Sequence, residues 1–444
     1  MGDIPKGWSA KKLKFSAKTM PSNVDKKTKN GEVPVQLCNY TDVYYGETVS
    51  HSPNFMKASA TLEQVEKFTL LAGDTIITKD SEDPNDIAIP AFVPDDLTGV
   101  VCGYHLSIIR PFDPEIGAYL KRCFEAPFAR SNFAVSAKGL TRYGLGTYAI
   151  DNVVFPIPPK EEAVQIASFL NHETAKIDDL IAKQQRLIAL LEEKRQAAIS
   201  HAVTKGLNPD APMRDAGIDW LGDIPAHWKL VPLLAVSEVI DPNPSHRNPE
   251  YVDEGFPFIS TQEFVGRDQV IIDTPRRVSE KTVLEQEARC NFQDGSIVFS
   301  RKGTIGATRV LPAGVRLGIL DSLCVINPKQ GMMPEFLANT LTSYYVAAQY
   351  GPIVNGAALP QLSVGKVRSL KLILPPENEQ IEIVQYLDEI LMKYEALNNK
   401  ALSAITLLQE RRTALISAAV TGKIDVRDWR SPADSDDTTQ GEAA

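Results

Sequence analysis

The chain has 444 residues, which is long for a single hydrophobic core and predicts two or three domains. Its hydrophobic fraction of 43% and charged fraction of 23% are typical of globular proteins, and no apolar run reaches the ~18–20 residues of a membrane helix. The 5 cysteines are scattered and form no CxxC pair, which favours reduced thiols over a disulfide framework or a metal site. With no apolar signal segment at the N-terminus, we expect a cytoplasmic protein.

The net charge of −9 argues against nucleic-acid binding until it is divided along the chain. Residues 1–158 carry 17 basic and 18 acidic side chains, and residues 224–376 carry 15 and 14, so both segments are near neutral. The acidic excess lies outside them. A basic run between Lys11 and Lys29 is consistent either with phosphate binding or with a solvated strand or loop. Because phosphate binding depends on local patches, the overall sign does not exclude it.

In chain order, residues 1–158 predict a mixed α/β domain with strands at 75–78 and 153–157 and an amphipathic helix at 113–130. Residues 159–205 predict one long helix, because 160–204 contain neither proline nor glycine, follow Pro158-Pro159 and precede Gly206.

The same order then returns after a polar linker. The predicted parts are the linker 206–223, a second α/β domain 224–376 with strands at 296–300 and 370–374 and a helix at 334–350, a second long helix 377–423, and a disordered acidic tail 430–444.

These parts form an internal repeat. Residues 158–204 align with 375–421 without a gap, and 19 of the 47 positions are identical. A second anchor pairs Ile4-Pro5-Lys6-Gly7-Trp8 with Ile224-Pro225-Ala226-His227-Trp228. Between the anchors the copies diverge. A repeat of this length indicates duplicated domains rather than a solenoid.

Both long helices carry an apolar seam at alternating spacings of four and three residues. Because neither small domain can cover such a helix, we expect the two helices to pack together as an antiparallel coiled coil, with the domains at opposite ends and related by an approximate two-fold. Parallel pairing, or packing against a different protein, is the alternative. The predicted fold class is therefore α+β, with two α/β domains joined and spaced by two long helices.

Catalytic motifs are missing from the sequence. It contains no dinucleotide-binding Gly-x-Gly-x-x-Gly after a strand and no phosphate-binding Gly-x4-Gly-Lys-Ser/Thr loop, and its 6 histidines lack metal-ligand spacing. Asp241-Pro242-Asn243-Pro244 predicts a turn. We therefore expect no catalytic residue, no cofactor and no metal in this chain, and interpret it as a recognition or scaffold subunit rather than an enzyme.

Several motifs nevertheless resemble one family. These are Pro375-Pro376-Glu377-Asn378-Glu379-Gln380, the helix end Ala419-Val420-Thr421-Gly422-Lys423, Trp220-Leu221-Gly222-Asp223-Ile224-Pro225-Ala226-His227-Trp228, and Phe299-Ser300-Arg301-Lys302-Gly303-Thr304-Ile305-Gly306. Together with the repeated architecture they resemble the specificity subunit of type I restriction–modification systems. The first copy departs from the pattern, because Lys79-Asp80-Ser81-Glu82-Asp83 replaces the Arg-Lys-Gly segment.

The resemblance implies that each globular domain is a target-recognition domain that reads one half of a bipartite, asymmetric sequence in double-stranded DNA. It implies that the helices set the spacer and dock two methyltransferase subunits, which bind S-adenosylmethionine and methylate adenine. Motor-nuclease subunits would complete an ATP-dependent endonuclease, and this chain would bind neither cofactor. A coiled-coil adaptor without DNA, or a fused methyltransferase, is the alternative function.

Candidate DNA-binding residues lie in the turn-rich segments of each domain. Arginine and lysine suit guanine and phosphate, and asparagine and glutamine suit adenine. The candidates are Lys79, Lys138, Arg142 and Tyr143 in the first domain and Arg301, Lys302, Thr304 and Gln361 in the second. A surface or phosphate-contacting role is the simpler interpretation for each of them.

Overall fold

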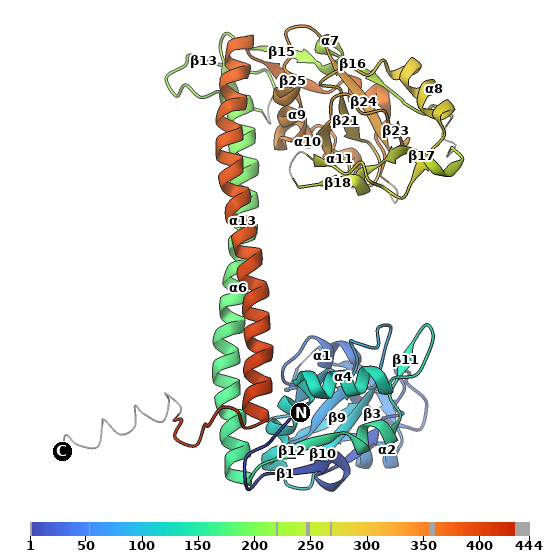
Figure 1. Ribbon diagram of the computed structural model, residues 1–444, viewed down its shortest axis with the longest axis vertical. Helices are drawn as coiled ribbons and strands as arrows, with labels where there is room; N and C mark the ends of the chain where they lie inside the picture. The colour runs from blue at the N-terminus through green and yellow to red at the C-terminus, as the bar shows by residue number, and fades with distance from the viewer. Residues whose placement is uncertain are drawn as a thin grey trace, which may run out of the picture. The chain divides into compact units, whose positions relative to one another are not determined.

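A computed structural model describes residues 2–52, 54–218, 221–245, 249–266, 269–354 and 360–430. The chain is a mixed helix and strand protein that divides into two compact units (Figure 1). Unit 1 comprises residues 1–185 and 402–444, and unit 2 comprises residues 186–401. The acidic tail predicted from residue 430 lies, beyond its first residue, outside the described residues.

Unit 1 contains two four-stranded sheets, ordered β2-β10-β6-β8 and β4-β3-β9-β5. Its strands are β1 (Ser9–Lys12), β2 (Ala17–Pro21), β3 (Val33–Cys38), β4 (Met56–Ala60), β5 (Thr69–Leu70), β6 (Thr75–Thr78), β7 (Asp80–Ser81), β8 (Pro90–Phe92), β9 (Leu97–Cys102), β10 (Leu106–Pro111), β11 (Tyr143–Gly144) and β12 (Val154–Ile157). Its helices within the globular part are α1 (Tyr40–Tyr44), α2 (Leu62–Phe68), α3 (Gly117–Glu125), α4 (Pro127–Ser136) and α5 (Thr147–Asn152).

Unit 2 is built on the four-stranded sheet β16-β24-β21-β22. Its strands are β13 (Met213–Asp215), β14 (Asp223–Pro225), β15 (Lys229–Pro232), β16 (Ser237–Ile240), β17 (Tyr251–Ile259), β18 (Phe264–Val265), β19 (Gln269–Val270), β20 (Arg277–Val278), β21 (Ile297–Ser300), β22 (Thr308–Val310), β23 (Gly318–Ile319), β24 (Leu323–Pro328) and β25 (Lys371–Leu374). Its short helices are α7 (Leu233–Val236), α8 (Glu280–Cys290), α9 (Pro334–Thr342), α10 (Tyr344–Ala348), α11 (Gly351–Val354) and α12 (Val364–Arg368).

Corresponding strands occupy corresponding places in the two main sheets. The order β2-β10-β6-β8 of unit 1 matches β16-β24-β21-β22 of unit 2, and every neighbouring pair in both sheets is antiparallel. The antiparallel pair β1-β12 likewise matches β15-β25. Outside these elements the units differ. Unit 1 has a second four-stranded sheet that contains β3 and β4, whereas unit 2 has a three-stranded sheet around β17 whose pairing with β20 shifts in register.

Two segments predicted as single helices are each divided in two. The segment 113–130 is interrupted at Ala126, where the backbone is extended. Pro127 explains the break, because a proline disfavours helical backbone in the residue before it. The segment 334–350 is interrupted at Ser343, whose backbone is also extended and whose hydroxyl donates to the carbonyl of Thr340 at 2.5 Å.

The two long helices are α6 (Lys160–Lys205) and α13 (Glu377–Val420), and each follows a Pro-Pro pair. Glycine closes both, because Gly206 and Gly422 have φ angles of 74° and 72° that other residues rarely adopt. A Cβ on Gly422 would also lie 2.2 Å from Cγ of Pro5. None of the helices in the described part of the chain is long and apolar enough to cross a membrane.

Each unit buries parts of both long helices in its own core. In unit 1, Ile166 and Leu170 of α6 share one apolar cluster with Ala419 and Val420 of α13 and with the globular part. In unit 2, Ile199, Ala202 and Val203 of α6 share a cluster with Ile383 and Leu387 of α13. Each unit therefore joins the beginning of one helix to the end of the other.

A tryptophan marks this junction in each unit. The indole of Trp8 donates to Glu162 Oε2 at 3.0 Å, and a Cβ on Gly422 would lie 3.3 Å from its ring. The indole of Trp228 donates to Glu379 Oε2 at 2.9 Å, and a Cβ on Gly206 would lie 3.1 Å from its ring. The repeated Ile-Pro-x-x-Trp motif thus ties the start of one long helix to the end of the other.

Candidate nucleic-acid interface

In unit 1, several loops meet at one end of the sheet β2-β10-β6-β8. The strands alternate in direction, so the segments after β2 and β6 come to the same end as the segment before β10. Val24 and Gly103 form a β-bridge there, and the amide of Lys79 donates to the carbonyl of His105 at 3.0 Å. Ser22 Oγ also donates to the carbonyl of Cys102 at 2.5 Å. The loop end is therefore held by backbone contacts.

A hairpin from residue 138 to residue 144 joins this loop end. Lys138 and Gly144 exchange two backbone hydrogen bonds of 3.1 and 2.9 Å, and the amide of Leu145 donates to the carbonyl of Lys79 at 2.8 Å. The structure thereby brings together the four candidates of the first domain. Lys138 and Arg142 are exposed, whereas Lys79 and Tyr143 are partly buried.

Charged partners orient the basic groups of this loop end. Arg142 Nη2 lies 2.6 Å from Asp80 Oδ1, and His105 Nδ1 lies 2.8 Å from Asp80 Oδ2. Lys79 Nζ donates to the carbonyl of Ser22 at 2.8 Å, and burial lowers the pKa of this ammonium although Asp80 opposes the shift. The ring of Tyr104 lies against that of His105, with 3.6 Å between centroids. Arg142, whose side chain is 55% exposed, remains accessible to solvent, as Lys138 does.

Unit 2 builds the same end of its sheet in the same way. The amide of Arg301 donates to the carbonyl of Ser322 at 2.8 Å, and the amide of Leu362 donates to the carbonyl of Arg301 at 2.8 Å. Lys302 and Gln361 form an antiparallel β-bridge. The four candidates of the second domain therefore also lie together, and Thr304 and Gln361 are exposed. The segment 355–359 beside them lies outside the described residues.

Arg301 differs from the surface position that we expected. Its side chain is only 2% exposed, and its Nη2 donates to Asp241 Oδ2 at 2.9 Å. A guanidinium is buried at lower cost beside a carboxylate, which explains why the Asp241 turn packs here. The predicted turn is present, with the amide of Asn243 donating to Asp241 Oδ1 at 3.0 Å. In this conformation Arg301 holds the loop end together and does not reach solvent.

Lys302 takes the accessible position beside it. Its Nζ lies 2.6 Å from Asp321 Oδ2, and its side chain is 29% exposed. In unit 1 the position after the partly buried Lys79 is the acidic Asp80, whereas in unit 2 the position after the buried Arg301 is the basic Lys302. The two loop ends therefore share a backbone arrangement and present opposite charges at one corresponding position.

Sequence reasoning missed the acidic and aromatic partners in these loop ends. Asp80 directly follows Lys79, so its place in the segment was a usable signal. His105, Asp241 and Asp321 lie 25, 60 and 19 residues from their partners Asp80, Arg301 and Lys302, and no local pattern connects them. Within the part of the chain that the structure describes, no group of three or more His, Cys, Asp or Glu side chains could hold a metal ion.

Gly139→Ala is expected to disorder the hairpin while leaving the rest of unit 1 folded. Gly139 has a φ of 154°, and a Cβ there would lie 1.9 Å from the carbonyl oxygen of Arg142. Strain of this kind costs ~1–3 kcal/mol locally. Hydrogen exchange should show faster exchange at the amides of 138–144. Gly146→Ala is the matched control, since nothing lies within 4 Å of its Cβ position, and equal exchange in both variants would contradict the prediction.

Comparison with known proteins identifies relatives of this chain. A type I restriction modification DNA specificity domain is recognised over residues 225–407, which span the globular part of unit 2 and the first part of α13. The EcoBI specificity subunit of Escherichia coli is 21% identical over 339 residues, covering 73% of this chain and 69% of that protein. The MjaVIII specificity subunit of Methanocaldococcus jannaschii is 22% identical, covering 62% of this chain and 63% of that protein.

Residues 225–407 form a type I restriction modification DNA specificity domain, and the chain is similar to specificity subunits of type I restriction enzymes.

Two solved structures of type I restriction–modification proteins have a similar fold. One chain, from a structure that addresses complex assembly and conformational transition of the type I R-M system, has a TM-score of 0.67 at 19% identity. The match covers 96% of this chain and 100% of that chain. The HsdS subunit from Thermoanaerobacter tengcongensis has a TM-score of 0.50 at 21% identity, covering 95% and 99%. At these identities the likeness concerns the fold.

Proposed function

We propose that this specificity subunit binds double-stranded DNA sequence-specifically and that each globular domain reads one half of a bipartite, asymmetric target. The observation that carries the proposal is the pair of loop ends, which share a backbone arrangement but present different side chains. One presents Arg142 beside Asp80 and His105, and the other presents Lys302 beside Asp321 and Gln361. Recognition of two different half-sites requires a shared backbone arrangement that carries different DNA-contacting side chains.

The proposed DNA contacts are the accessible candidates of each loop end, with arginine and glutamine able to contact base edges and lysine able to contact phosphates. They are Lys138, Arg142 and Tyr143 in unit 1 and Lys302, Thr304 and Gln361 in unit 2. For Lys79 and Arg301 we propose a supporting role, because each donates from its side chain to the neighbouring loop.

We propose further that α6 and α13 form an antiparallel coiled coil that spaces two pseudo-two-fold-related domains. The shared clusters in each unit and the matching sheet orders support this arrangement. The proposed parts are the recognition domains 1–158 and 224–376, the spacer helices 159–205 and 377–423 and the linker 206–223, which contains β13 and the first residue of β14.

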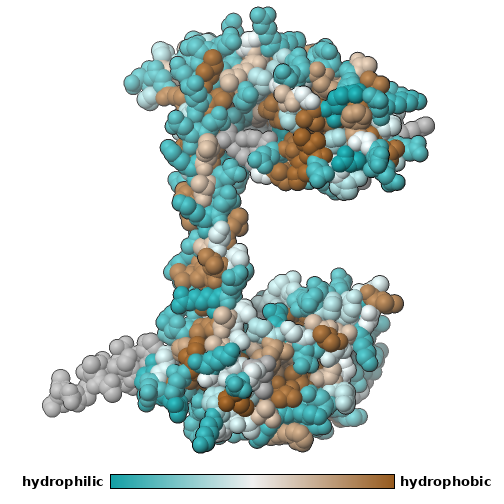
Figure 2. Space-filling view, viewed as in Figure 1, coloured by the Kyte–Doolittle hydropathy of each residue, from teal (hydrophilic) through white to brown (hydrophobic). Residues whose placement is uncertain are grey.

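The helices also supply a docking surface for partner subunits in this proposal. Large apolar side chains stand exposed on both helices, as the brown patches along them show in Figure 2; they include Leu180, Leu187, Leu190, Met392, Leu397, Leu402 and Leu407. Two DNA methyltransferase subunits would cover them, and motor-nuclease subunits would join the complex in the cytoplasm. The specificity subunit would itself be non-catalytic, and adenine would be flipped and methylated by its partners.

Methylation mapping tests the proposed function directly. The chain is co-expressed with the products of its neighbouring genes in a host that lacks adenine methylation, and methylated adenines are mapped across the host genome. We expect one motif with two defined half-sites separated by an unspecified spacer of fixed length. Absence of any chain-dependent motif, together with no salt-dependent retention of the complex on duplex DNA, would favour the alternative of a coiled-coil adaptor.

Arg142→Ala is expected to weaken DNA binding by the complex and to reduce the slope of log affinity against log salt by about one, if Arg142 contacts a phosphate. If Arg142 contacts a base, the slope is retained and discrimination at one position falls by about 1–3 kcal/mol. Binding titrations at several salt concentrations distinguish these cases. Arg130→Ala, an exposed arginine on α4, is the control, and an Arg142 variant indistinguishable from it would remove Arg142 from the interface.

A further inference from the structure

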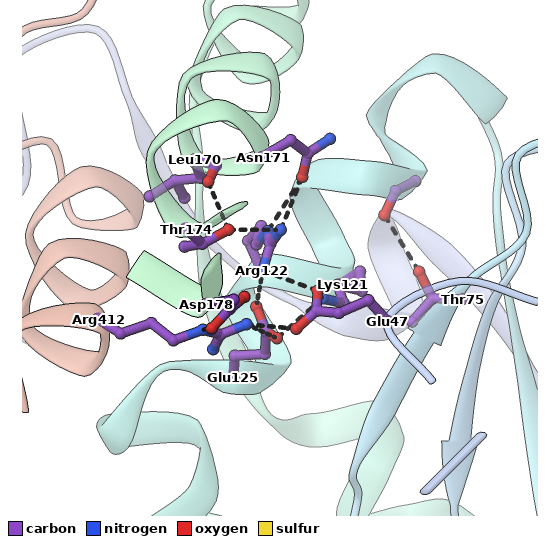
Figure 3. Close-up of polar contacts among 11 residues, drawn as sticks. Glu47, Thr75, Lys121, Arg122, Glu125, Leu170, Asn171, Thr174, Asp178 and Arg412 are labelled. Carbon is purple, nitrogen blue, oxygen red and sulfur yellow. Dashed lines mark hydrogen bonds and ion pairs between the residues drawn. The ribbon is translucent and has the colours of Figure 1, made fainter. Parts of the chain in front are cut away.

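An ion network in unit 1 connects the globular domain to both long helices (Figure 3). Its members are Lys121, Arg122 and Glu125 of α3, Glu47 of the loop after α1, Asn171, Thr174 and Asp178 of α6, and Arg412 of α13. Three basic and three acidic side chains balance one another. These charged side chains are not needed to fill an apolar core. Their position, where the globular domain meets α6 and α13, suggests that they hold the domain on the helices.

The centre of the network is buried. Lys121 and Arg122 have side chains only 3% and 5% exposed, and both contact Glu125 at 2.8 Å. Arg122 also donates through Nη2 to Asn171 Oδ1 at 2.8 Å and to Thr174 Oγ1 at 3.2 Å. Burying two cations is costly unless each is paired, so these contacts fix α3 on α6 in one geometry.

Arg412 closes the network from the other helix. Its Nε donates to Asp178 Oδ1 of α6 at 3.0 Å, and its Nη2 contacts Glu47. Burial favours the neutral form of Glu47, but Lys121, Arg122 and Arg412 outweigh it and lower the pKa of this carboxyl to about 2. Glu47 therefore stays ionised at neutral pH and links α13 to α3.

The network is coupled to the DNA-facing loop end through the sheet. The amide of Phe92 in β8 donates to the carbonyl of Glu47 at 3.1 Å, and Thr75 Oγ1 of β6 donates to the carbonyl of Gly117 in α3 at 3.1 Å. β6 and β8 are paired neighbours, and β6 runs directly into Lys79. Rotating α3 on the helices would therefore rotate the loop end with it.

The short helix of unit 2 that corresponds to α3 lacks the three charges of α3. α9 matches α3 in length, and both end before an extended residue, so Ala338, Asn339 and Thr342 correspond to Lys121, Arg122 and Glu125. Arg195 corresponds to Arg412 in the repeat, and it contacts Glu192 of its own helix at 3.1 Å. The two recognition domains are therefore attached to the same frame by different chemistry.

We propose that Arg412 and its ion network are positioning elements that fix the orientation of the first recognition domain on the helices, and thereby restrict the spacer length of the target. This inference rests on the proposed function. Arg412 acts through Glu47, Glu125 and Asp178 and not through contact with DNA. In the second domain α9 contributes none of these charges, and we expect the equivalent change at Arg195 to be tolerated.

Spin-label distances test the orientation directly. In the assembled complex, labels are attached at Val135→Cys, which lies on α4 and is 88% exposed, and at Lys183→Cys on α6, both within unit 1. The five native cysteines are buried and should not react. Arg412→Ala should broaden the distance distribution, Arg412→Lys should restore part of its sharpness, and Arg195→Ala should leave it unchanged. An unchanged width in Arg412→Ala would overturn the inference.

A methylation assay tests whether the network restricts the spacer length. It compares duplexes that carry the native spacer with duplexes whose spacer is one base pair longer or shorter. The ratio of off-length to native-length rates should rise about fivefold in Arg412→Ala, the factor expected for one partly exposed charged contact, and remain at the wild-type value in Arg195→Ala. An unchanged ratio with a lowered melting temperature would show a purely structural role and overturn the inference. A wild-type complex without any bipartite target would overturn the proposed function itself, while the label distances would still decide the orientation.

Discussion

Removing seven residues from each long helix is expected to abolish methylation of the native target and to create a new target with the same half-sites and a shorter spacer. Seven residues shorten a helix by about 10 Å and return the apolar seam to the same face. At ~3.4 Å per base pair, this corresponds to about three base pairs of duplex DNA. Genome-wide methylation mapping of the variant complex measures both quantities at once.

The position of the deletions follows from the ion pair between Arg412 and Asp178, which sets the two helices side by side in unit 1. Residues 184–190 and 400–406 are centred at equal distances from that pair. Deletion of 184–190 alone is the control, because it shifts one seam against the other and should prevent assembly rather than change the spacer. Altered half-sites with an unaltered spacer in the double deletion would exclude the helices as the spacing element.

Trp228→Ala is expected to destabilise unit 2 by ~3–5 kcal/mol, the usual cost of removing a large buried aromatic side chain. Trp228 is 1% exposed, lies against Gly206 and donates from its indole nitrogen to Glu379. The substitution therefore creates a cavity beside Gly206 at the end of α6 and also removes the hydrogen bond from the indole to Glu379 at the start of α13. Chemical denaturation followed by circular dichroism should show an earlier transition for unit 2.

Trp8→Ala provides the matched comparison on the other copy of the motif. Trp8 donates to Glu162 in the same way but is only partly buried, so its removal should cost less than the removal of Trp228. Trp228→Phe should recover most of the packing while lacking the hydrogen bond to Glu379. Equal losses of stability in Trp8→Ala and Trp228→Ala would show that burial of the ring is not what determines the effect.

Local patterns in the sequence were sufficient for much of the fold. The glycine- and proline-free segments, each preceded by Pro-Pro, predicted the extents of α6 and α13 to within a few residues, and the β-branched run at 75–78 coincides with β6. The breaks at Ala126 and Ser343 were missed, although Pro127 was a usable signal for the first.

The candidate site was less accessible to sequence reasoning. Turn composition located the segments that form both loop ends, but it could not distinguish an exposed cation from a buried one. Arg301 and Lys302 are neighbours of the same charge type, and the structure buries the first beside Asp241 and leaves the second at the surface. That choice depends on a carboxylate 60 residues away, which no local pattern reveals.

Unit 1 is built from two segments that lie far apart in the chain, and this has a consequence for synthesis of the protein. Its core needs Ile416, Ala419 and Val420, whereas its globular part is complete before residue 160. On the ribosome, the first domain must therefore wait, with an apolar face uncovered, while about 260 further residues are made, and unit 2, which is contiguous, can close first. A chain interrupted before α13 ends would carry that uncovered face permanently, which makes it a substrate for chaperones and proteases rather than a half-functional subunit.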